Sequence, residues 1–141
     1  MNKDILISVL LLITIALGCV KENTPTTPVN NPVDTSTAVS LFSGTFNNGP
    51  YGVVSGKARI YLQDNGSILT LENFNSSNGP DLHVYISKEE QPVNYIDLGR
   101  LQSVTGNQQY PLTGTINFSE YKFALIHCQR YNHLFGSAEL K

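Results

Sequence analysis

Short segments in which apolar and polar residues alternate recur along most of the chain. In VVSGKARIYLQ (53–63) the apolar Ala58, Ile60 and Leu62 alternate with more polar residues, and LHVYIS (82–87) repeats the pattern. A period of two residues is typical of a β-strand that buries one face. Both segments are therefore predicted to be strands.

Further segments have the composition of strands and are separated by turn residues: ILTLENF (68–74), YIDLGRL (95–101), QQYPLT (108–113), FALIHC (123–128) and LFGSAEL (134–140). The pair Asn65–Gly66 tolerates positive φ angles and predicts a tight hairpin, and Gly106–Asn107 predicts another turn. Only INFSEY (116–121) could form a single helical turn. We expect an all-β fold, a single antiparallel β-sandwich of the Greek-key or jelly-roll type, with about eight or nine short strands.

The N-terminus is different in character, because it is a nearly continuous apolar run. Lys3 precedes the run, which extends over residues 5–17 and ends in small residues. It is too short to span a bilayer comfortably and is typical of a secretory signal peptide. Residues 16–19 (Ala-Leu-Gly-Cys) resemble a bacterial lipobox, which implies a signal peptide over residues 1–18 and lipidation of Cys19.

A lipidated Cys19 would anchor the protein to a membrane without a transmembrane helix. Several acyl chains, such as palmitate, bind a bilayer far more firmly than one. We therefore expect a lipoprotein of the bacterial cell envelope, at the outer membrane, with the leaflet left open. Residues 19–40 are rich in Pro, Thr and Asn. Such a composition buries little apolar surface and predicts an extended tether, followed by one folded domain over residues 41–141.

Charge and motifs exclude several classes of function. The formal net charge is -2 and no basic run is present, which argues against a nucleic-acid partner. The sequence has no glycine-rich phosphate loop and none of the nucleophile or zinc-protease motifs of hydrolases. The motifs in the sequence therefore favour a protein that is not an enzyme, and no hydrolase or transferase constellation is present.

The most distinctive residue is Cys128, the one thiol left if Cys19 carries lipid. An intramolecular disulfide is then excluded. Cysteine is often buried, and FALIHC is apolar on both faces, so Cys128 could be a core residue. Alternatively it is a redox group or cofactor ligand, with His127, His133 and His83 as accessory ligands in that order. The spacing of Cys128 and His133 occurs in some blue-copper loops, and haem ligation by a thiolate or imidazole is also compatible.

Several segments together resemble the DM-thirteen domain, found in Skeletor-type animal proteins and in many bacterial lipoproteins. The segments are SGKARI (55–60), LENFNSSNGPDLHVYIS (71–87), LGRLQSVTGNQQYPL (98–112) and IHCQRYNHLFGSAEL (126–140). The resemblance implies an all-β domain that occurs beside haem-binding modules and is assigned to electron transfer. The family's cysteine corresponds to Cys128. Its structural motifs correspond to the following residues: Gly79, Pro80, Asp81, Phe135, Gly136, Ala138 and Leu140.

Two positions depart from the family pattern. The family usually has Trp before the cysteine, where this chain has His127, and an apolar or small residue at the position of His133. Our leading hypothesis is a lipid-anchored extracytoplasmic domain with a role in electron transfer centred on Cys128, exchanging electrons with a redox partner or another cell-envelope protein. The alternative hypothesis is a non-catalytic binding or adhesion module in which Cys128 is a core residue. Neither reading identifies a cofactor.

Overall fold

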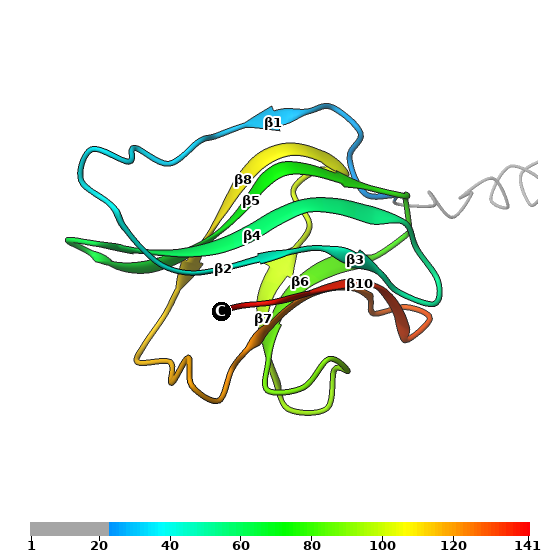
Figure 1. Cartoon of the computed structure of the whole chain (residues 1–141). Helices are drawn as coiled ribbons and strands as arrows, with labels where there is room; N and C mark the ends of the chain where they lie inside the picture. Colours follow the sequence, from blue (N-terminus) through cyan, green and yellow to red (C-terminus); the bar gives the residue numbers. More distant parts are fainter. Residues whose placement is uncertain (1–22) are drawn as a thin grey trace, which may run out of the picture.

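The computed structural model of the protein describes residues 23–141, so the predicted signal peptide and Cys19 lie outside the described residues. This part forms two five-stranded sheets packed face to face (Figure 1). In spatial order, sheet A contains β1 (Val29–Asn30), β8 (Thr105–Leu112), β5 (Gly66–Ser76), β4 (Val54–Gln63) and β2 (Val39–Thr45). Sheet B contains β3 (Asn47–Asn48), β10 (His133–Glu139), β9 (Phe123–Cys128), β6 (Leu82–Ser87) and β7 (Tyr95–Arg100).

This architecture confirms the predicted all-β sandwich. All neighbouring strands are antiparallel except β1 and β8. There are ten strands rather than eight or nine, and the segments named from the sequence correspond to seven of them. The strands β1 and β3 were missed because two residues carry no alternation, and the edge strand β2 because none of its residues is fully buried. Residues 23–141 contain no helix, and so none that could cross a membrane.

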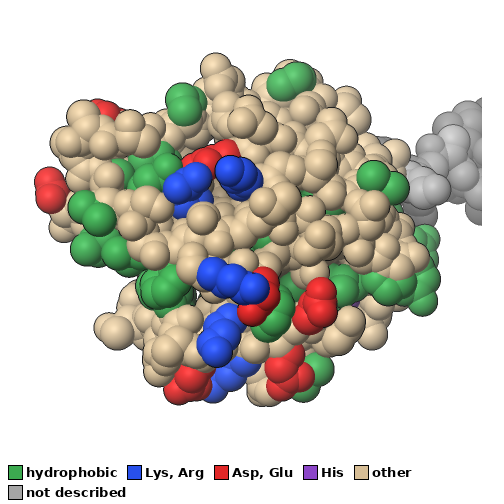
Figure 2. All heavy atoms as spheres, in the orientation of Figure 1, with side chains coloured by type: hydrophobic (Ala, Val, Ile, Leu, Met, Phe, Trp, Pro, Cys, Tyr) green, Lys and Arg blue, Asp and Glu red, His purple; other side chains and the backbone are tan. Residues whose placement is uncertain are grey.

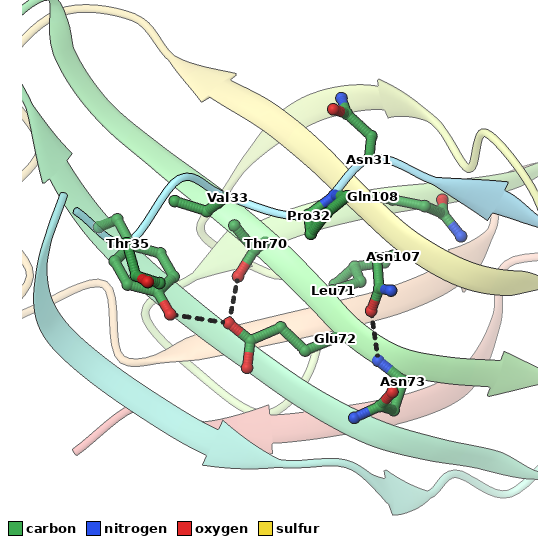
Figure 3. Close-up of a pocket in the computed structure, with 11 residues that line it drawn as sticks. Asn31, Pro32, Val33, Thr35, Thr70, Leu71, Glu72, Asn73, Asn107 and Gln108 are labelled. Atoms are coloured by element: carbon green, nitrogen blue, oxygen red, sulfur yellow. Dashed lines mark hydrogen bonds between the residues drawn. The ribbon is translucent and has the colours of Figure 1, made fainter. Parts of the chain in front are cut away.

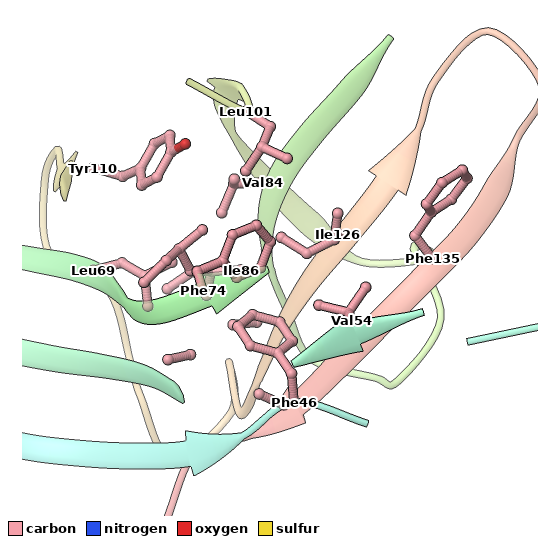
Figure 4. Packing of buried hydrophobic residues seen from close by; sticks show 14 of the residues in the cluster. Phe46, Val54, Leu69, Phe74, Val84, Ile86, Leu101, Tyr110, Ile126 and Phe135 are labelled. Atoms are coloured by element: carbon pink, nitrogen blue, oxygen red, sulfur yellow. The ribbon is translucent and has the colours of Figure 1, made fainter. Parts of the chain in front are cut away.

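The core lies between the inner faces of the two sheets, where aromatic and branched aliphatic side chains pack against one another (Figure 4). Phe46 and Phe74 meet edge to face with ring centroids 5.5 Å apart. The alternation in β4 correctly predicted Ala58 and Ile60, which are fully buried. It was wrong for Leu62, which is 45% exposed. Leu62 lies next to the β4–β5 hairpin, which projects past the edge of sheet B (Figure 1).

The central strand of sheet A, β5, contains a bulge around Asn73. Two β5 residues face one residue of β4 on one side and one residue of β8 on the other, and both registers shift at this point. Asn73 and the neighbouring Gly56 of β4 and Gly106 of β8 have φ angles of 46°, 106° and 110°. A bulge bends its strand and increases the local twist. The predicted turn at Gly106–Asn107 was wrong, because both residues lie inside β8, where Gly106 pairs with Phe74 beside the bulge.

The N-terminal strap (residues 24–38) lies along β8 and is held by hydrogen bonds. The amide and hydroxyl of Thr24 donate to the carbonyl of Gly79 at 3.1 and 3.0 Å. The Val104 amide donates to the carbonyl of Pro25 at 2.9 Å, and β1 adds a short parallel ladder on β8. The sequence predicted an extended tether here. The strap is extended, and polar contacts rather than apolar burial hold it on the sheet.

Gly106 makes the attachment of the strap possible. A Cβ at Gly106 would collide with the Val29 carbonyl of β1, whereas a Cβ at Gly66 (φ 123°) would meet no atom within 4 Å. We expect Gly106→Ala and Gly66→Ala each to lose roughly 1–2 kcal/mol of stability through positive-φ strain. Only Gly106→Ala should also release the strap, which hydrogen exchange at the Asn31 and Val104 amides would detect. Equal protection of these amides in both variants would contradict this role.

Candidate functional site

Cys128 is the last residue of β9 and is completely buried, with 0% of its surface exposed. It belongs to the main core cluster together with Ala124 and Ile126, so its side chain faces the interior between the sheets. In the sheet it is paired with Leu82 of β6 on one side and with His133 of β10 on the other. It is a free cysteine.

The turn at residues 129–132 decides how Cys128 and His133 meet. Asn132 adopts a φ of 52°, which Asn tolerates better than most residues, and its amide donates to the carbonyl of Gln129 at 3.3 Å. The turn closes a hairpin in which His133 is the cross-strand partner of Cys128. Because cross-strand partners point to the same face of a sheet, the two side chains share one face despite being five positions apart.

His133 connects this buried position with the surface. Its ring stacks on Tyr51 with centroids 3.7 Å apart and an interplanar angle of 2°, and the ring centroid of Tyr131 lies 5.8 Å from that of His133. Tyr51 and Tyr131 are 57% and 55% exposed. Sequence reasoning missed both tyrosines, because their loops are far apart in the chain and neither has a recognisable pattern. Tyr51 and His133 therefore form a stack of two rings that extends from the solvent to the cross-strand partner of Cys128.

The predicted motif residues gather at the same end. The Gln129 amide donates to the carbonyl of Asp81 at 3.0 Å. A Cβ at Gly79 would lie 2.8 Å from the Leu82 side chain and 3.1 Å from the Phe135 ring, so only glycine fits there without movement. Pro80 and Asp81 form the predicted turn before β6. These loops therefore enclose the end of the sandwich that contains Cys128.

Gly136 and Ala138 place β10 against sheet A. The β9–β10 register shifts at Leu134–Gly136, and a Cβ on Gly136 would lie 2.7 Å from the Val54 side chain. Gly136 therefore lies at a bulge and at a close approach of β10 to β4. Ala138 is fully buried in the core cluster.

His127 points away from Cys128, to the outer face of sheet B. Its Nε2–H donates to Oδ1 of Asn132 at 3.1 Å, and its Nδ1 is buried without a hydrogen-bond partner among the described residues. Its ring lies 5.3 Å from that of Tyr85. Burial lowers the pKa of His127, although the hydrogen bond that His127 donates to Asn132 opposes the shift. Burial raises the pKa of Tyr85 to about 12, so both side chains are uncharged at neutral pH.

His83 is also on the outer face, where carboxylates hold it. Its Nδ1 lies 3.0 Å from both carboxylate oxygens of Asp97, which can only accept, so Nδ1 carries a proton. Its Nε2 lies 3.5 Å from Oδ1 of Asp81, and Arg100 approaches the same oxygen at 3.4 Å. The sequence could not pair these scattered acids with a histidine. His83 is thus part of a polar network and does not face Cys128.

These positions decide which cofactors the chain could hold. A copper site with Cys128, His133 and His83 is not formed, because His83 lies on the opposite face of sheet B. No group of three or more His, Cys, Asp or Glu residues suited to a metal ion occurs between residues 23 and 141. The hollow beside His127 and Asn132 has about 230 Å³, below the roughly 300–1,000 Å³ typical of small-molecule sites, so it does not fit haem.

A second hollow of about 280 Å³ lies between the strap and the outer face of sheet A (Figure 3). On its floor, the hydroxyls of Tyr61 and Thr70 donate to Oε1 of Glu72 at 3.1 and 3.2 Å. Asn107 accepts the Asn73 amide at 2.9 Å through its side-chain oxygen. No sequence pattern predicts this hollow, since it arises from the packing of the strap.

The lowered pKa of His127 has a consequence for stability. The unfolded chain takes up this proton near the ordinary value of about 6.5, before the folded chain does. The contribution of neutral His127 to the free energy of unfolding is therefore fully present above about pH 6.5 and is lost as the pH falls below it. We expect His127→Gln to lose less stability than the parent between about pH 7 and pH 5, measured by urea unfolding. Parallel pH profiles would contradict this account.

The enclosure of Cys128 predicts its reactivity. In a Cys19→Ser chain, where Cys128 is the sole thiol, we expect a thiol reagent to react only as the domain unfolds, so the rate should rise with urea. Cys128→Ser should lose roughly 1–3 kcal/mol of stability by burying an unsatisfied hydroxyl, and Cys128→Ala should lose less. Rapid labelling of the native protein would show that the end of the sandwich is open.

Comparison with known families agrees with this arrangement. Residues 45–140, most of the described part, match the family model described as Electron transfer DM13. No curated protein and no solved structure matches the chain. The matched range covers more than half of the chain and includes the hairpin of Cys128, the 79–81 turn and the bulge at Gly136, and the protein therefore belongs to the DM13 electron-transfer family.

Proposed function

We propose that the protein is a lipid-anchored extracytoplasmic electron-transfer domain whose redox site is the end of the sandwich that contains Cys128. Family membership supports a redox role. One observation carries the choice of this end: the motif segments of the family converge there, around a thiol whose cross-strand partner is His133. The lipobox-like residues 16–19 support attachment to a membrane of the bacterial envelope.

The stacked rings suggest how a buried sulfur takes part in electron transfer. Cys128 is shielded from water, so it is protected from the oxidation that threatens exposed thiols outside the cytoplasm. Tyr51 is half exposed and stacks on His133, the strand partner of Cys128. In the proposed role, a redox partner docks against Tyr51 and takes one electron from Cys128 as the thiol loses its proton, and an electron and a proton supplied later restore the thiol. The stack of Tyr51 on His133 shortens the gap that the electron must cross. The described residues offer at most a thiol and an imidazole here, so any larger metal centre needs ligands from the partner.

A second function has its own support. Complete burial of Cys128 also suits a core residue, and the hollow beneath the strap presents the hydroxyls and carboxylate of Tyr61, Thr70 and Glu72. Such a polar recess is compatible with a binding or adhesion module that recognises a hydroxyl-rich ligand such as a glycan. The family match favours the electron-transfer function over this one.

Voltammetry of the full chain in detergent tests the leading proposal. We expect a reversible redox response that disappears in Cys128→Ala and persists in His127→Gln, because His127 faces away from the thiol. Tyr51→Ala should retain the response with slower electron exchange. An unchanged response in a folded Cys128→Ala protein would refute the role of the thiol. A silent parent protein would favour the binding module instead.

A further inference from the structure

The described chain begins at the same end of the sandwich as the redox site. Thr24 is tied to Gly79 by two hydrogen bonds, and Gly79 packs against the ring of Phe135. The carbonyl of Phe135 in turn accepts the amide of Gly49, in the loop that carries Tyr51. These contacts link the first described residues to the β3–β4 and β9–β10 loops.

The position of Thr24 limits how far the domain can stand from an anchor. Thr24 follows Cys19 by only five residues, a stretch that spans at most about 17 Å when fully extended. If the strap were free, the chain from Cys19 to the domain boundary at residue 41 could reach several times farther. Docking of the strap therefore keeps this end of the domain within reach of the surface in which an anchor at Cys19 sits.

The side chains at this end are those that bilayer interfaces accommodate. We define the aromatic patch as Tyr51, Val53, Tyr131 and His133. The exposed fraction is 57% for Tyr51, 66% for Val53 and 55% for Tyr131. Figure 2 shows apolar side chains gathered at this end of the molecule, beside the start of the described chain. Tyrosines favour the headgroup level, where the ring meets apolar chains and the hydroxyl meets water.

The charges at this end are also suited to phosphate headgroups. The loops 47–53 and 129–132 contain no carboxylate, and the second contains the exposed Arg130. Two acids beside Gln129, Asp81 and Asp97, form ion pairs with His83, and Asp97 also accepts a hydrogen bond from Gln129 at 2.8 Å. The acids that give the chain its net charge of -2 are therefore absent from the two loops that carry the patch.

We propose that the aromatic patch lies on the lipid bilayer to which the chain is anchored. The proposal rests on the lipid anchor of the proposed function and adds an orientation to it: the end with Cys128 faces the membrane and the β4–β5 hairpin points away. The partner that exchanges electrons through Tyr51 is then resident in the membrane. A soluble protein that binds the patch is the competing occupant.

Fluorescence offers a direct test, because the sequence contains no tryptophan. Tyr131→Trp places one indole in the patch, and Leu62→Trp places one at the far end of β4, roughly 30 Å away along the strand. Each mature lipoprotein is reconstituted into phosphatidylcholine–phosphatidylglycerol vesicles whose acyl chains are brominated or not. We expect bromine to quench the emission of the Tyr131→Trp protein severalfold more than that of the Leu62→Trp protein.

Mass spectrometry of the same samples separates this proposal from the anchor itself. If Cys19 proves not to be acylated, the anchor fails, and the test is repeated with Cys19 coupled to a maleimide lipid, which Cys128 cannot compete for while it is buried. With either tether, equal and weak quenching at both positions overturns the proposal. Strong quenching at Leu62→Trp alone would do so as well, since it reverses the orientation.

Discussion

The bulge of β5 at Asn73, flanked by the positive-φ glycines Gly56 and Gly106, is the constraint on which the rest of the structure depends. It bends the central strand of sheet A, and all three residues need a backbone conformation that few residue types adopt. At Gly106 the absent side chain lets β1 approach β8, so the same feature seats the strap. The seated strap fixes where the chain enters the domain, beside the loops that enclose Cys128. A local requirement for positive φ thus determines which end of the sandwich the N-terminus reaches.

Alternation predicted the long strands well, because a two-residue period follows directly from a sheet with one dry face. It failed where other contacts decide burial. Tyr61 was placed on the polar side of β4, yet it is 7% exposed because the strap covers that face. Gly106–Asn107 had the composition of a turn, and only the register of the neighbouring strands shows that it lies inside β8. The strands β1 and β3 have two residues each, too few for any period. The strand β2 was missed as well, since none of its residues is fully buried.

The histidines show the same limit at the candidate site. Sequence proximity grouped His127 with Cys128, but adjacent residues of a strand point to opposite faces, and His127 lies on the outer side. His133 is farther along the chain and yet shares the face of Cys128, because the turn at 129–132 folds β10 back beside β9. The conformation of Asn132 decides this, and it could be suspected from the residue type but not established. The contacts of His83 with Asp81 and Asp97 depend on the register of β6 and β7, which the sequence does not reveal.

The strap also has a mechanical consequence. It runs along β8 from the point where the chain enters, so a force on the N-terminal chain acts nearly parallel to the strap. The bonds of Thr24 to Gly79, Val104 to Pro25 and Asn31 to Asn107 lie across that direction and share the load. Peeling would break such bonds one after another, whereas shear must break them together. The attachment of the strap is therefore suited to resist tension applied through the N-terminal chain.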